Sequence, residues 1–84
     1  RTRERNDLMP RDLVHYVAQN LVEDPEALQT SADRGGRNVR IEIRCAPGDA
    51  GRIIGRNGRI INAIRTLARA AADGRGRVDV HLLD

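Results

Sequence analysis

Aromatic residues are almost absent from this chain of 84 residues. It contains no Phe and no Trp, and its one aromatic side chain is Tyr16. A sheet that binds nucleic acid by stacking bases on aromatic side chains needs several of them on one surface. The composition therefore excludes that type of binding sheet and requires a core of aliphatic residues.

Lysine is missing as well. All 15 basic residues are Arg, and the formal net charge is +3. A GC-rich genome produces this composition without any functional cause. Arginine nevertheless suits phosphate groups better than lysine does, because its planar guanidinium donates two parallel hydrogen bonds. A basic surplus on a small domain indicates a nucleic-acid ligand, although a solvated basic face has the same composition.

Residues that could carry redox or metal chemistry are few. Cys45 is the single cysteine, so the chain forms no intramolecular disulfide, which fits a reducing compartment. His15, His81 and Cys45 stand in three different predicted elements and lack the spacing of metal ligands. No candidate base accompanies Cys45. We therefore predict no metal, no cofactor and no enzymatic activity.

Long apolar runs are also absent. No stretch approaches the roughly 18 residues that a membrane span needs, and no signal peptide is apparent. The predicted location is the cytoplasm, without membrane association.

The first part of the chain is predicted to be a tail and a helix. Residues 1–7 are all polar or charged, which is typical of a disordered tail, and residues 8–84 form a single domain. The helix begins at Met9, with Pro10 in its first turn, and Pro25 stops it.

The central part alternates between apolar and polar residues. A short strand near Ala27–Thr30 is doubtful, and the sequence DRGGRN that follows has the composition of a turn. Val39–Cys45 is a half-buried strand whose Val, Ile and Cys side chains face one way. Asp49 then stands where it can cap a short helix, Ala50–Ile54.

A long amphipathic helix and a last strand complete the domain. The helix runs from Arg59 to about Ala72, and its apolar side comprises Ile60, Ile61, Ile64, Leu67, Ala68 and Ala71. The last strand, RVDVHLL, alternates from Val78 to Leu82. The fold class is therefore α+β in the order α-β-β-α-α-β, with a three-stranded mixed sheet and three helices on one face. The two clear strands lie parallel, joined by a right-handed helical crossover.

Two glycines interrupt the helical pattern of IIGRNGRIINAI, residues 53–64. Gly55 can end the short helix in a left-handed conformation, with Arg56 and Asn57 at the tip of a turn, and Gly58 starts the next helix. Without side chains at the glycines, a phosphate can approach backbone N–H groups at the positive end of the helix dipole. The side chains of Arg52 and Arg59 flank the same point. The alternative is that GRNG is only a turn between two helices.

This stretch resembles the signature of the KH domain, I-I-G-x-x-G-x-x-I-x-x-I. The positions are met by Ile53, Ile54, Gly55, Gly58, Ile61 and Ile64. The order of elements is similar to the bacterial type II KH arrangement. From Leu8 to Leu83 the chain resembles a family of small bacterial proteins that are a single KH domain, the KhpA-like family. The family often has Lys in the loop where Arg56 stands, which keeps the charge.

The resemblance implies binding of single-stranded RNA, with the GxxG loop clamping the backbone of about four nucleotides. The RNA-binding residues carried over are Gly51, Arg52, Ile54, Gly55, Arg56, Asn57, Gly58 and Arg59. Side chains of the strand Val39–Cys45 would supply floor or edge contacts. The family also implies pairing, as a homodimer or as a heterodimer with a larger KH-containing RNA-binding protein.

Three functions remain open from the residues. The first is an RNA-binding protein that acts as a post-transcriptional regulator or RNA chaperone. The second is a protein–protein interaction module with little RNA binding of its own. The third is a small-anion or mononucleotide site at the start of the long helix. The RNA targets, base preference and dimer interface lie beyond the sequence.

Overall fold

The predicted order of elements is confirmed in the computed structural model, which describes residues 2–72, 74 and 76–83. Its helices and strands are α1 (Thr2–Gln19), β1 (Gln29–Gly35), β2 (Asn38–Arg44), α2 (Ala50–Ile54), α3 (Arg59–Ala72) and β3 (Val78–Leu83). Three single turns of 3-10 helix join them, at Pro25–Ala27, Pro47–Asp49 and Arg56–Gly58. Arg1 of the predicted tail and Asp84 of the predicted domain lie outside the described residues.

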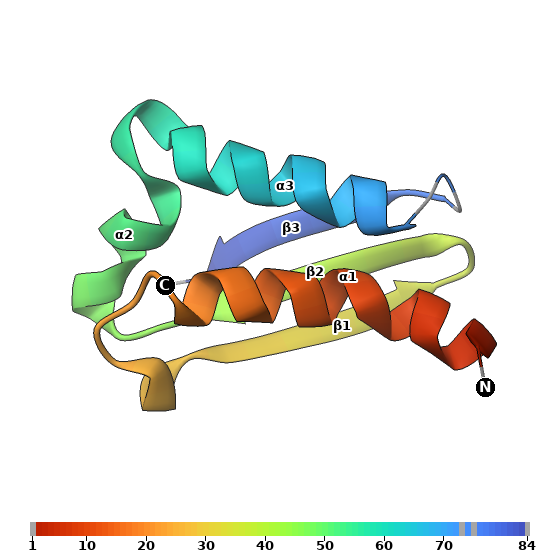
Figure 1. Cartoon of the computed structure of the whole chain (residues 1–84), viewed down its shortest axis with the longest axis horizontal. Coiled ribbons are helices and arrows are strands. Elements are labelled where there is room, and N and C mark those ends of the chain that lie inside the picture. The colour runs from red at the N-terminus through yellow and green to blue at the C-terminus, as the bar shows by residue number, and fades with distance from the viewer. Residues whose placement is uncertain (1, 73, 75, 84) are drawn as a thin grey trace.

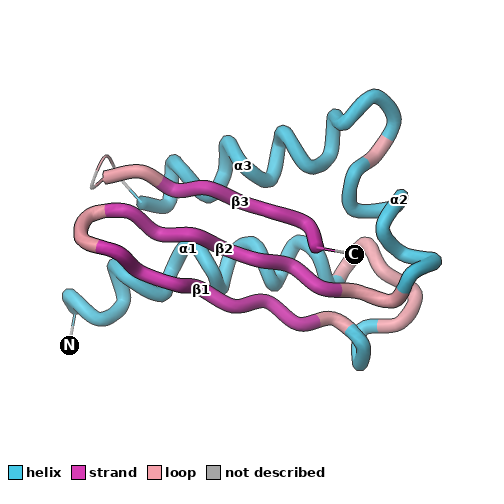
Figure 2. Tube along the Cα trace, turned by 180° about the vertical axis from the view of Figure 1, so that it is seen from behind, coloured by secondary structure: helices cyan, strands magenta, loops and turns pink. Residues whose placement is uncertain are grey.

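The three strands form one mixed sheet in the order β1-β2-β3. β1 pairs antiparallel with β2, and β2 pairs parallel with β3, as the helical crossover predicts. Figure 1 shows α1 and α3 side by side across one face of the sheet, with α2 beyond the strand ends next to the start of α3. Figure 2, seen from behind, shows the other face without helices. The fold is thus a two-layer α+β arrangement.

Aliphatic side chains between the helices and the sheet form the core. Ile41 and Ile43 of β2, Ile53 of α2 and Ile64 of α3 are at most 1% exposed. The alternation predicted for β2 is confirmed, because Arg40 and Arg44 point to the uncovered face and are exposed. Burial of this kind stabilises by about 1.5–3 kcal/mol per side chain.

The first strand is longer than predicted. β1 begins at Gln29 and continues to Gly35, and β2 begins at Asn38, so most of the segment DRGGRN expected to be a turn is strand. The turn itself is only Gly36 and Arg37, and Gly36 has a φ of 62°. A glycine at this place suits a two-residue hairpin turn, whose twist matches that of the paired strands. Pairing with β2 therefore outweighs the low strand propensity of DRG.

α1 starts earlier than predicted. The backbone is helical from Thr2, through the segment expected to be a tail, so that Pro10 lies inside the helix and not in its first turn. No Gly or Pro stands before Pro10 to stop the helix, and a proline removes one backbone donor without forbidding the turns that precede it. Pro10 itself is buried.

Candidate nucleic-acid interface

The loop between α2 and α3 is a tight turn with glycine at both ends. Gly55 follows α2 with φ 76° and ψ 170°, and its N–H donates to the carbonyl of Gly51 at 2.9 Å. Asn57 is left-handed, with φ 58° and ψ 24°, and Gly58 has φ 76°. The Gly58 N–H donates to the Gly55 carbonyl at 3.1 Å. Arg56 and Asn57 are exposed at the tip, as predicted.

The backbone conformation and the packing at position 55 require glycine, independently of any ligand. Its backbone is not in the predicted left-handed helical region but in an extended region with positive φ that is nearly exclusive to glycine. A Cβ built on Gly55 would lie 2.6 Å from Cγ1 of Ile60 and 2.9 Å from its backbone nitrogen. The missing side chain thus lets α3 fold back closely onto the end of α2.

The neighbouring glycines leave open space. A Cβ on Gly58 would be 3.7 Å from Nδ2 of Asn62, which is ordinary contact. At Gly51, which is exposed in the first turn of α2, a Cβ would meet nothing within 4 Å. Glycine inside a helix costs about 0.5–1 kcal/mol relative to alanine, and no packing contact among the described residues requires it at Gly51.

Two of the three arginines near the loop are available to a ligand. Arg56 and Arg59 are exposed, and among the residues that the structure describes their side chains have no ion-pair or hydrogen-bond partner. The backbone N–H of Arg59, in contrast, is used within the loop, where it donates to the carbonyl of Arg56. Any phosphate at the start of α3 must therefore be held by the remaining N–H groups and by these two guanidinium groups.

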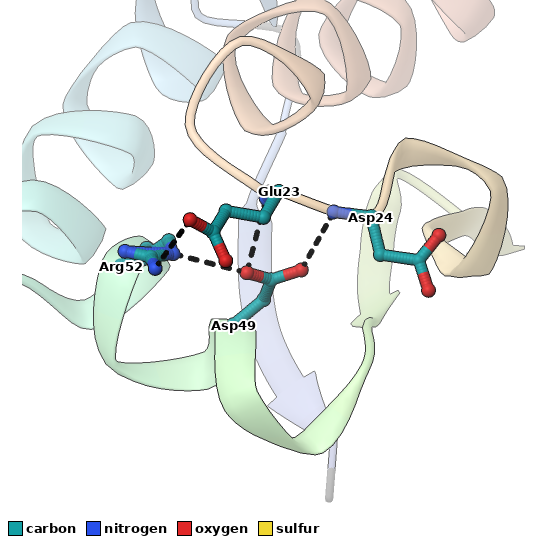
Figure 3. Close-up of polar contacts among 4 residues, drawn as sticks. All are labelled: Glu23, Asp24, Asp49 and Arg52. Atoms are coloured by element: carbon teal, nitrogen blue, oxygen red, sulfur yellow. Dashed lines mark hydrogen bonds and ion pairs between the residues drawn. The ribbon is translucent and has the colours of Figure 1, made fainter.

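Arg52 is already engaged. Its Nη2 lies 3.1 Å from Oε2 of Glu23, and its Nε lies 3.1 Å from Oδ1 of Asp49 (Figure 3). The contact with Asp49 joins residues three apart on the chain, but Glu23 lies far from Arg52, so the sequence pattern gave no signal for the Glu23 contact.

Asp49 does not cap α2, contrary to the prediction. Its side chain makes no capping hydrogen bond with the helix that it precedes. Instead its two carboxylate oxygens accept the backbone N–H groups of Glu23 and Asp24, each at 3.1 Å. Asp49 is 3% exposed, so these bonds satisfy a charge that is held away from water.

The surface beside the loop is partly apolar. Ile54 is 41% exposed, whereas its neighbour Ile53 is fully buried. The strand expected to provide a floor is the central strand β2, and its inward Ile41 and Ile43 are inaccessible. The half-buried Cys45, just after β2, lines a surface pocket of about 290 Å³ together with Ala46, Pro47, Ala50 and Leu83. The outer strand next to α3 is β3, where Nε of Arg65 donates to the carbonyl of Val80 at 3.2 Å.

Within the described part of the chain, no three His, Cys, Asp or Glu residues are grouped so that they could hold a metal ion. His15 contacts Oγ1 of Thr30 through Nδ1 at 2.9 Å, which joins α1 to β1. Among the described helices, none is long and apolar enough to cross a membrane.

Comparisons with known proteins agree with this geometry. The profile of the KhpA/KhpB KH domain matches residues 11–82. The RNA-binding protein KhpA of Caldanaerobacter subterraneus subsp. tengcongensis is 44% identical over 61 residues, covering 73% of this chain and 81% of that protein. The RNA-binding protein KhpA of Leifsonia xyli subsp. xyli is 42% identical over 69 residues, covering 82% and 90%.

A more distant relative extends the agreement further along the chain. The RNA-binding protein KhpA of Borreliella burgdorferi is 36% identical over 74 residues, or 87% of this chain. No solved structure matches. The resemblance seen in the sequence is confirmed, since the profile covers α2, the GRNG loop and α3 together with most of the sheet. The chain therefore belongs to the KhpA/KhpB KH-domain family.

Proposed function

We propose that this protein binds single-stranded RNA by its sugar-phosphate backbone, with GRNG (Gly55–Gly58) as the clamp. One observation carries the proposal. The side chains of Arg56 and Arg59 extend from the glycine turn at the positive end of α3 and, within the described residues, have no ion-pair or hydrogen-bond partner. Exposed guanidinium groups at a helix start suit phosphate. The names of the KhpA relatives, which are RNA-binding proteins, support the same ligand.

Bases would lie on the surface beside the clamp. Ile54 offers an exposed apolar side chain, and the bare backbone of Gly51 leaves room for a ring or a sugar at the same helix face. No aromatic side chain lines this surface, so contacts to bases are aliphatic and tolerant of sequence. A protein of this kind would act as a post-transcriptional regulator or RNA chaperone in the cytoplasm, and it would bind RNA without transforming it.

Pairing with a second KH domain would strengthen such binding. A single site for about four nucleotides is weak, and two linked sites raise the apparent affinity through their effective concentration. Tyr16 on α1 is 63% exposed, and Leu67 on α3 is 44% exposed. Leu67 is exposed although it lies on the apolar side of α3. α1 and α3 lie side by side, so these residues favour pairing through the helical layer, either with a second copy or with a larger KH protein. They are also the observation that favours the alternative of a pure interaction module.

The proposal is tested by titrating the protein with a fluorescent single-stranded RNA of mixed sequence at several salt concentrations. Binding should weaken steeply as the salt concentration rises. Each phosphate contact should contribute about −0.7 to the slope of log K against log salt. A mononucleotide should bind far more weakly than the oligomer. Equal binding of the two would indicate a small-anion site in place of an RNA clamp.

A further inference from the structure

The contacts of Asp49 join two parts of the chain that are distant in sequence. Oδ1 accepts the N–H of Glu23, and Oδ2 accepts the N–H of Asp24, both in the connection between α1 and β1. Oδ1 also accepts Nε of Arg52 on α2, and the outer end of that guanidinium pairs with Glu23. Figure 3 shows the side chains of Glu23, Asp49 and Arg52 meeting between the two segments, whereas Asp24 contributes its backbone N–H and its side chain points away. We call these residues, Glu23, Asp24, Asp49 and Arg52, the Asp49 junction.

α2 cannot hold its own position. It has only five residues, far fewer than an isolated helix needs to be stable in water. Contacts outside the helix therefore hold it: Ile53 is fully buried in the core, α3 packs back onto the end of α2 at Gly55, and the Asp49 junction holds its N-terminal end. Gly55 follows directly after α2, so the direction in which α2 leaves the junction sets the position of the GRNG loop.

We propose that Asp49 is a positioning residue for RNA binding, which holds α2 and the GRNG loop in the conformation that the backbone of RNA requires. Arg52 serves the same junction and does not contact phosphate. This inference rests on the proposed RNA clamp. Nothing in the pattern of the sequence assigns such a role to Asp49, which stands where a helix cap is expected and caps nothing.

The sign of the effect separates positioning from simple electrostatics. Asp49→Asn removes one negative charge, which by itself would strengthen binding to a polyanion. If Asp49 positions the loop, the same change weakens RNA binding, by about tenfold, because the amide cannot accept both N–H groups and α2 must be ordered on binding. The matched control is Asp79→Asn, which removes the same charge on the uncovered sheet face, where Asp79 pairs with Arg77. The control should bind RNA as tightly as the unaltered chain or slightly more tightly.

A second control separates positioning from loss of stability. Val80→Ala truncates a core side chain that is 3% exposed in β3 and belongs to neither the junction nor the loop. Measured at a temperature where all variants are folded by circular dichroism, Val80→Ala should keep the RNA affinity of the unaltered chain although its melting temperature falls. If it weakens binding as much as Asp49→Asn does, general destabilisation explains both and the positioning role is overturned.

Different results would contradict the RNA clamp and the positioning role of Asp49. If the unaltered chain binds no RNA, the clamp itself fails; if it binds and Asp49→Asn binds equally well, only the role of Asp49 fails. Should Asp49→Asn not fold, Arg52→Gln tests the junction from its exposed side. It should weaken binding severalfold with an unchanged salt slope. Unchanged affinity would show that Arg52 does not hold the loop in position. A slope of log K against log salt that is less steep by about 0.7 would show that Arg52 contacts phosphate directly.

Discussion

Gly55 and Ile60 are in such close contact that no side chain fits between them. A Cβ on Gly55 would come within 2.6 Å of Cγ1 of Ile60, and the φ of 76° at Gly55 disfavours any other residue independently. The first glycine of the loop is therefore a structural requirement for the sharp return from α2 to α3. Changes at Gly55 cannot separate RNA contacts from folding, whereas changes at Gly51, Arg56 and Asn57 can.

Gly55→Ala should lower the free energy of unfolding by at least about 2 kcal/mol, from backbone strain and the clash with Ile60. Chemical denaturation measures this value. Gly48→Ala is the control, because a Cβ there meets nothing within 4 Å and its φ is not positive. It should change stability by no more than about 0.5 kcal/mol. Equal effects of the two substitutions would show that Gly55 is not constrained as described.

Gly51→Ala should act in opposite directions on stability and on binding. Alanine is the better helix former and finds open space, so the free energy of unfolding should rise by about 0.5–1 kcal/mol. The new methyl group should also occupy the place of the RNA and weaken its binding. Denaturation and RNA titration of the same variant measure both quantities. A stabilised variant with full RNA affinity would remove Gly51 from the binding surface.

Arg56→Gln should reduce the number of phosphate contacts by one. The slope of log K against log salt should then become less steep by about 0.7. Arg37→Gln provides the comparison, since Arg37 is also exposed but lies in the turn between β1 and β2, at the opposite end of the molecule (Figure 1). Its slope should equal that of the unaltered chain. If both arginines change the slope alike, binding depends on overall charge and not on the loop.

Local patterns predicted the elements that carry the loop. The sequence predicts α2 at Ala50–Ile54 and α3 from Arg59 to about Ala72, because Gly and Pro mark their boundaries and their apolar periodicity is regular. The inward side chains of β2 followed from strict alternation. Each of these features is encoded within a few neighbouring residues, so reading the sequence in short windows finds them.

Features that depend on distant segments were not predictable in this way. The length of β1 is set by its pairing with β2, in which Ala32 lies opposite Ile41. The composition of the last residues of β1 indicated a turn instead. The role of Asp49 depends on backbone N–H groups 25 and 26 residues earlier. The close approach of Ile60 to Gly55 is local in sequence, but it depends on the conformation of the turn, which residue periodicity does not show.

The central claim is tested most directly by charge reversal at the tip of the loop. Arg56→Asp combined with Asn57→Asp puts two carboxylates where the RNA phosphates would lie. Both positions are exposed, and Asp tolerates the left-handed conformation of Asn57. The chain offers a matched control, because the same dipeptide, Arg37-Asn38, forms the last residue of the β1–β2 turn and the first residue of β2.

We would titrate single-stranded RNA of mixed sequence against the unaltered chain, the loop double variant, and Arg37→Asp with Asn38→Asp, after circular dichroism has shown that all three are folded. The two variants have the same charge change, so general electrostatics affects them equally. The account predicts salt-sensitive binding by the unaltered chain, a partial loss for the control and no detectable binding by the loop variant. Equal binding by the two variants, or no binding by the unaltered chain, would contradict the assignment of GRNG as an RNA clamp.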